Sequence, residues 1–260
     1  MDISRFCFIA LFGLAIGVLS GLFGVGGGTM IVPMLNLVFG LPMKNASATS
    51  LFSIAPTSIS GSYRHIKART VNLPVACMFG IPGAITSTLS AGFSDRLPDW
   101  VALAATIGVL GFSAYRMFAE AAKPAIDETG RTAAPRFKSQ ATANAATIAI
   151  GTFAGLIAGI VGVGGGFIIV PAGMALLGMT MKEMSAISLT AIAIIALPGI
   201  ATHAVLGHIY YLYGVALVAG TIPGAAIGVT LLPKIGEKTL RIAFGCLLVI
   251  SGALLVLNRL

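Results

Sequence analysis

Charged residues are scarce in this chain of 260 residues. They make up 9% of the sequence, whereas 57% of the residues are hydrophobic. Soluble domains use roughly 25% charged residues to cover a water-facing surface. The shortage excludes a soluble enzyme, a nucleic-acid-binding domain and a disordered tail, and the sequence therefore predicts a protein with several transmembrane segments.

Acidic side chains are missing from the interior of every apolar run. The eight Asp and Glu residues lie in loops or at segment ends, although proton pumps and many cation carriers place a carboxylate in mid-membrane. A cation is therefore not the expected substrate. The sequence has no catalytic triad, metal-ligand cluster, Walker loop or paired cysteines. We expect no enzymatic activity, no cofactor and no metal site.

The sixteen Lys and Arg residues give a net charge of +8, but they lie in short gaps between apolar runs. Such basic loops set the orientation of a membrane protein. A protein that binds nucleic acid would instead gather its cations on a face that follows the phosphates. The expected surroundings of the chain are a lipid bilayer and not nucleic acid.

Ten apolar runs alternate with polar gaps. Most have about the 20 residues that a helix needs to cross a bilayer, but two are too short. Residues 120–140 form the one clear hydrophilic stretch, a predicted cytoplasmic linker between a first membrane repeat at 1–119 and a second at 141–260. The runs are 6–23, 29–40 (short), 46–63, 73–92, 100–118, 141–161, 167–178 (short), 185–206, 211–231 and 240–258.

The two halves repeat each other at an offset of 138 residues, which takes Gly24 to Gly162. Eleven of 21 positions are identical over the first matching stretch. The GxxxG spacing of Gly13, Gly17 and Gly21 and of their counterparts predicts close contact between helices. The identical residues of the first half are Gly13, Gly17, Gly21, Gly24, Val25, Gly26, Gly27, Gly28, Ile31, Val32 and Pro33.

The number of segments in each half decides whether the repeat is parallel or inverted. With one long span through each glycine-rich region, eight helices divide the Lys and Arg residues ten to six. With a chain that doubles back at each GVGGG, five segments per half divide them twelve to four. Because basic residues concentrate on the cytoplasmic side, we predict an all-α polytopic membrane protein with an inverted repeat. Each half then has a glycine-broken helical hairpin and three transmembrane helices.

The GVGGG stretches are the strongest candidates for a binding site. Each glycine disfavours a helix by about 1 kcal/mol relative to Ala, and irregular backbone survives in a membrane only where it is buried or lines a cavity. A helix that restarts after such a break presents free N–H groups to an anion. Close packing of helices is the alternative role. The candidate residues are Gly24, Gly26, Gly27, Gly28, Thr29, Gly162, Gly164, Gly165 and Gly166.

Hydroxyl groups on the next segment of each half can donate to an anion without the desolvation penalty of a charged side chain. Ser47 and Ser185 occupy equivalent positions in the two halves, as do Ser50 and Ser188. Serine also bonds to its own helix, which is the alternative. His203 is a candidate coupling residue, with a structural role as its alternative.

The sequence resembles the sulfite exporter TauE/SafE family. The resemblance rests on GLFGVGGGTMIVP with ATSL at 48–51, on GIVGVGGGFIIVP with SAISL at 185–189, on two IPGA segments and on KTLRIAFGCLL at 238–248. It implies a permease of the cytoplasmic membrane for small sulfur-containing or organic anions, such as sulfite and sulfonates, and it adds Thr49 to the candidate site. The expected function is secondary transport by alternating access, and an anion channel is the alternative.

Overall fold

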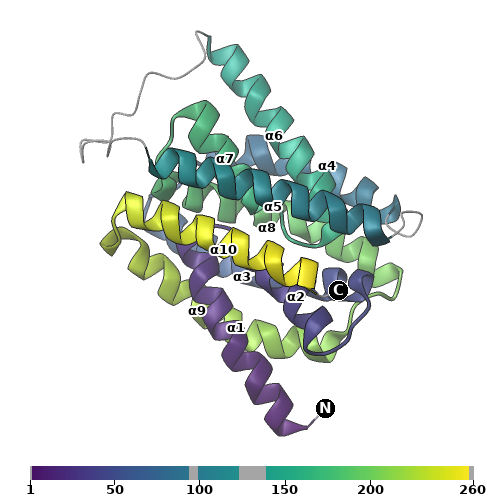
Figure 1. Ribbon diagram of the computed structural model, residues 1–260. Coiled ribbons are helices and arrows are strands. Elements are labelled where there is room, and N and C mark those ends of the chain that lie inside the picture. The colour runs from purple at the N-terminus through teal and green to yellow at the C-terminus, as the bar shows by residue number, and fades with distance from the viewer. Residues whose placement is uncertain (1, 94–98, 123–138, 258–260) are drawn as a thin grey trace.

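The computed structural model describes residues 2–93, 99–122 and 139–257 (Figure 1). These residues form ten α-helices and one short 3-10 turn, with no β-strand among them. The elements are α1 (Ile3–Phe23), α2 (Gly28–Leu37), α3 (Met43–Lys67), α4 (Leu73–Phe93), α5 (Asp99–Ala121), α6 (Gln140–Val161), α7 (Gly166–Leu177), α8 (Met181–Val205), α9 (Tyr211–Leu231), η2 (Leu232–Lys234) and α10 (Glu237–Leu257).

The ten helices coincide with the ten apolar runs, which confirms the predicted all-α membrane fold. Six of them are long and apolar enough to cross a membrane: α1, α4, α6, α8, α9 and α10. The two predicted short segments are α2 and α7, with 10 and 12 residues, or about 15 and 18 Å of helix. Most of the predicted linker, and with it the boundary between the halves, lies outside the described residues.

The packing of the helices repeats between the two halves. α1 lies along α9, and their counterparts α6 and α4 lie along each other. α3 packs against α9 and α8 packs against α4, while α3 contacts α8. Figure 1 shows α5 and α10 side by side across the front of the bundle, where they also pack together. Each half therefore places its first helix against the fourth helix of the other half.

Small residues bring α1 and α9 into backbone contact. A Cβ atom on Gly17 would lie 2.5 Å from the carbonyl oxygen of Thr221, and one on Gly224 would overlap the carbonyl oxygen of Leu14. Helices in a bilayer associate through such close van der Waals contact, because lipid is as apolar as the side chains. The GxxxG spacing thus has the packing role that the sequence predicts.

The equivalent helices α3 and α8 run antiparallel. Gly61, near the end of α3, faces Leu189 near the start of α8, and Gly199, late in α8, faces Leu51, early in α3. A parallel duplication would orient these two helices the same way, whereas an inverted repeat requires the opposite orientation. The antiparallel pairing supports the inverted arrangement, which stays a prediction.

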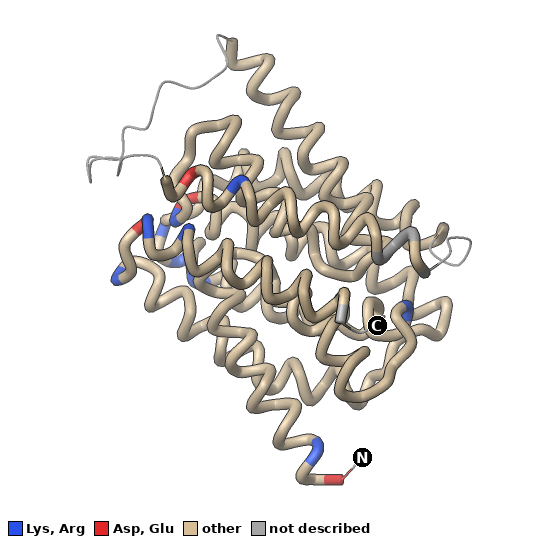
Figure 2. Tube along the Cα trace, viewed as in Figure 1, with Lys and Arg blue, Asp and Glu red and all other residues tan. Residues whose placement is uncertain are grey.

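Lys and Arg gather at one end of the bundle. Figure 2 shows most of the blue segments where α5 and η2 end and where α10 begins. Arg241 donates from Nη1 to the carbonyl oxygen of Glu120 at 3.1 Å, which joins α10 to α5 at this end. The start of α1, which carries Arg5, lies away from this group. The uneven distribution agrees with the orientation predicted for a chain that doubles back.

Paired hydrogen bonds fix the beginning of α8. Thr180 Oγ1 accepts from the N–H of Glu183 at 3.2 Å, and Glu183 Oε2 accepts from the N–H of Thr180 at 2.8 Å. The Glu237 carboxylate of α10 accepts from the N–H groups of Met181 and Lys182 at 3.0 and 3.2 Å. These acceptors satisfy N–H groups that a helix leaves free at its start. They hold α8, and with it the serines further along the helix, in place.

Replacing Gly17 with Ala is expected to lower the free energy of unfolding by about 1–3 kcal/mol, because the added methyl group overlaps the backbone of Thr221. Thermal unfolding in detergent measures the effect. Gly111→Ala in α5 is the matched control, since nothing lies within 4 Å of the Cβ position on Gly111 and Ala favours a helix. Equal unfolding midpoints for the two variants would contradict the assigned packing.

Candidate functional site

Two glycine-rich stretches interrupt the helical hairpins of the two halves. We define the first glycine break as residues 24–27, between α1 and α2, and the second as residues 162–165, between α6 and α7. A residue with a Cβ atom loses about 1–2 kcal/mol in the left-handed backbone region, which glycine enters freely. The breaks contain six glycines with φ between 71° and 85°: Gly24, Gly26, Gly27, Gly162, Gly164 and Gly165.

The two glycine breaks meet inside the protein. A Cβ atom on Gly28 would lie 2.7 Å from Cα of Val163, and one on Gly166 would lie 2.7 Å from Cα of Val25. Residues 20–29 and 161–171 are buried throughout. The sequence predicts that the breaks converge, and the structure brings them into direct backbone contact.

The short helices α2 and α7 begin at these breaks without a side-chain cap. Their N-cap residues are Gly27 and Gly165, and neither helix has an acidic residue in its first turn. Thr29, a predicted site residue, is buried in the first turn of α2. The first N–H groups of a helix have no acceptor within the helix, and the macrodipole adds about half an elementary positive charge. Two helices therefore direct partial positive charge toward the glycine breaks.

Two isoleucines close the space beside both breaks. The Cβ position on Gly26 lies 2.8 Å from Cγ2 of Ile54 in α3 and 3.3 Å from Cγ2 of Ile192 in α8. The Cβ position on Gly164 lies 3.3 and 3.4 Å from the same two atoms. The repeat offset relates Ile54 to Ile192, and both side chains are fully buried. Ile54 and Ile192 therefore pack against both glycine breaks, which are buried in this structure.

Serines of each half border the glycine break of the other half. The Cβ position on Gly24 is 2.5 Å from Cα of Ser185, and that on Gly162 is 2.5 Å from Cα of Ser47. Ser185 Oγ also donates to the carbonyl oxygen of Leu22 at 3.1 Å. That carbonyl belongs to the last turn of α1, where the helix supplies no donor. Ser185 therefore fastens the end of α1 to α8.

The other predicted hydroxyls differ in their surroundings. Thr49 Oγ1 accepts from the N–H of Tyr210 at 3.0 Å, at the N-cap of α9. Ser50 and Ser188 are fully buried, and their Oγ atoms have no hydrogen-bond partner among the described residues. A buried hydroxyl without a partner lowers stability by about 1–3 kcal/mol. Ser50 and Ser188 thus have a donor to spare, whereas Thr49 is engaged, and the binding role of all three stays a prediction.

Sequence reasoning identified His203 and missed His65. Nε2 of His203 lies 3.3 Å from the carbonyl oxygen of Gly159, and its Nδ1 lies 3.4 Å from Nδ1 of His208. Nδ1 of His65 lies 2.8 Å from Oγ1 of Thr70. The repeat offset takes His65 to His203 and Thr70 to His208, and this relation is the signal that was overlooked. These contacts give both histidines a structural role, and the coupling role of His203 stays a prediction.

Metal ligands are not grouped in the part of the chain that the structure describes. No three His, Cys, Asp or Glu residues there are placed to hold a metal ion. The side-chain atoms nearest to the Cβ positions of the glycine breaks belong to aliphatic residues and serines.

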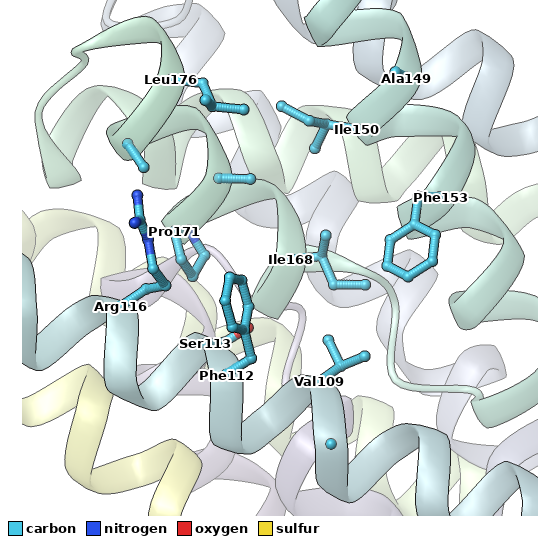
Figure 3. Close-up of a pocket in the computed structure, with 13 residues that line it drawn as sticks. Val109, Phe112, Ser113, Arg116, Ala149, Ile150, Phe153, Ile168, Pro171 and Leu176 are labelled. Atoms are coloured by element: carbon cyan, nitrogen blue, oxygen red, sulfur yellow. The ribbon is translucent and has the colours of Figure 1, made fainter.

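An apolar groove of about 620 Å³ lies between α5, α6 and α7. Figure 3 shows Phe112, Phe153 and Ile168 along this groove, with Arg116 at one end. Phe112 and Phe153 are 65% and 50% exposed, so the groove opens to the outside of the bundle. Its apolar lining suits lipid, and it offers an anion few of the donors found at the glycine breaks.

Comparison with known proteins identifies the family. The family model for the sulfite exporter TauE/SafE matches residues 9–255. The chain belongs to the TauE/SafE family. It is 27% identical to the probable membrane transporter protein YunE of Bacillus subtilis, over 96% of this chain and 97% of that protein. It is 26% identical to a probable membrane transporter protein of Methanocaldococcus jannaschii, over 96% and 94% of the two chains. With its six candidate spans, this TauE/SafE protein is a multi-pass membrane protein of a transporter family.

Ser185→Ala is expected to lower the free energy of unfolding by about 1–3 kcal/mol, because it leaves the buried carbonyl of Leu22 without its donor. Ser188→Ala, one turn further along α8, is the matched control. Its hydroxyl has no hydrogen-bond partner in the described part of the chain, so this variant should be as stable as the unmodified protein or more so. Denaturation in detergent compares the two, and a larger loss for Ser188→Ala would refute the assigned hydrogen bond.

Proposed function

We propose that this TauE/SafE protein is a secondary transporter that moves small sulfur-containing or organic anions, such as sulfite and sulfonates, across the cytoplasmic membrane. Membership of a transporter family supports transport. The observation that carries the choice of an anion is the meeting of two uncapped helix N-termini at the glycine breaks. Free N–H groups at a helix start favour negative charge, and no carboxylate lies in the first turn of α2 or α7.

The proposed mechanism is alternating access between two oppositely oriented halves. In many secondary transporters, two inverted halves move relative to each other around a site formed by broken helices. The antiparallel α3 and α8, and the contacts that each break makes with the other half, support this mechanism. Ile54 and Ile192 pack against both breaks, so their movement is part of the proposed cycle, and counterflow of substrate distinguishes a carrier from a channel.

Transport of a defined anion tests this proposal. Liposomes that contain the purified protein and unlabelled sulfite should accumulate labelled sulfite from outside, and the initial rate should saturate with concentration. Gly27→Leu is expected to abolish this counterflow, since Gly27 has φ of 85° and its Cβ position lies 2.7 Å from Cγ2 of Ile16. Membrane insertion of the variant, measured alongside, is the control.

Large unitary currents carried by sulfite would show that the protein is an anion channel and not a carrier. Unchanged counterflow in Gly27→Leu would show that the first glycine break is not part of the transport path. An inert unmodified protein, tested with sulfite and with sulfonates, would refute the proposed function as a whole.

Labelling of single cysteines tests the inverted arrangement. In a chain whose three native cysteines are replaced, an impermeant maleimide added to intact cells should label Asp2→Cys. It should not label Ser139→Cys or Lys67→Cys until the cells are opened. All three positions are exposed, so a difference in labelling reports the side of the membrane. Labelling of Asp2→Cys only from the cytoplasm would contradict the orientation.

A further inference from the structure

The two glycine breaks differ in the hydroxyl groups around them. The repeat offset takes Ser20 of α1 to Ala158 of α6, and Ser58 of α3 to Ala196 of α8. The same offset of 138 residues relates the nearby Ile54 to Ile192, so the alignment of the two halves is continuous here. Two serines of the first half therefore correspond to alanines, which have no hydroxyl, in the second half.

The side chains of both serines lie beside the first glycine break. Ser58 Oγ is 3.4 Å from the Cβ position on Gly26, and Ser20 Cβ is 3.8 Å from the Cβ position on Gly27. Ser20 and Ser58 are 1% and 0% exposed. Neither Oγ atom has a hydrogen-bond partner among the described residues. Two unpaired donors thus flank the backbone from which α2 begins.

A buried hydroxyl without a partner destabilises a protein, and a native structure that contains one calls for an explanation. At the first break, the explanation lies in a ligand that accepts hydrogen bonds. The free N–H groups of α2 point toward the same backbone segment. Ser50 and Ser188 are unpaired in both halves, so they do not distinguish the breaks, whereas Ser20 and Ser58 do.

The surroundings of these donors also limit the charge of the ligand. The atoms nearest to the Cβ positions on Gly26 and Gly27 belong to isoleucines and serines, none of which is charged: Ile16, Ser20, Ile31, Ile54, Ser58 and Ile192. The penalty for removing an ion from water rises with the square of its charge in the Born description, and a buried charge needs compensation. Neutral donors therefore suit an anion with one charge better than an anion with two.

We propose that the first glycine break is the principal anion site and that Ser20 and Ser58 donate to a monovalent oxyanion held there. Suitable ligands are hydrogensulfite or an alkyl sulfonate, and sulfate is excluded by its second charge. The second break, with Ala158 and Ala196, packs against the first and does not hold the anion. This inference rests on the proposed transport of anions and specifies the site and the charge state of the substrate.

Binding to the purified full chain tests the inference, with methanesulfonate as a fixed monoanion and sulfate as a fixed dianion. Loss of hydrogen bonds to a charged ligand should weaken methanesulfonate binding about 10- to 100-fold in the double variant Ser20→Ala/Ser58→Ala. Its thermal stability should not fall, because neither hydroxyl has a hydrogen-bond partner among the residues that the structure describes. The unmodified protein should bind sulfate at least about tenfold more weakly than methanesulfonate.

Ser87→Ala is the matched control, because Ser87 in α4 is also fully buried with an unpaired hydroxyl but faces Gly199 rather than a glycine break. Its methanesulfonate affinity should equal that of the unmodified protein. Unchanged affinity in the double variant, or equal losses in both variants, would overturn the role of Ser20 and Ser58 while leaving anion transport in place. Equal affinity for sulfate would overturn the proposed charge state. An unmodified protein that neither binds nor transports any anion would remove the proposed function and this site together.

Discussion

Left-handed backbone at the centre of a membrane protein is readily built only from glycine, and the two helical hairpins of this chain depend on it. Six glycines with positive φ allow α1 to end and α2 to begin within a few residues, and α6 and α7 likewise. A side chain at any of these six positions would strain the backbone. A side chain on Gly28 or Gly166, which follow the breaks, would separate the two breaks, since their Cβ positions lie 2.7 Å from Cα of Val163 and Val25. The small residues along α1 and α9 act at longer range, because they bring the first and fourth helices of opposite halves close enough for the breaks to meet.

The same constraint sets the chemistry of the site. Backbone that leaves a helix inside a membrane exposes N–H and C=O groups that have to find hydrogen-bond partners. In this protein the ends of α1 and the start of α9 are satisfied by Ser185 and Thr49, whereas the starts of α2 and α7 receive no side-chain cap. Unused donors therefore accumulate at the paired breaks, together with the unpaired hydroxyls nearby. Ile54 and Ile192 cover them, so a bound anion and the movement of these two side chains are coupled in the proposed transport cycle.

The helices and the breaks could be predicted from the sequence because a bilayer imposes a length and a hydrophobicity on each span, and because glycine is the residue that leaves a helix at low cost. The length of each apolar run likewise identified the two short segments that form α2 and α7. The state of individual hydroxyls could not be predicted, since it depends on contacts between residues far apart in the chain. Ser185 meets Leu22 and Thr49 meets Tyr210 only after the halves interlock. Alignment of the two halves also pairs Ser58 with Ala196. Without the fold, however, nothing in the sequence places this difference beside a glycine break.

Direct location of a bound anion tests the central claim most sharply. A crystal structure with bromomethanesulfonate would show the bromine by its anomalous scattering. We expect a single strong peak beside Gly26 and Gly27, with the sulfonate oxygens near Ser20 and Ser58 and with Ile54 displaced from its present position. A peak confined to the groove beside Arg116, or one at the second break beside Ala158, would contradict it.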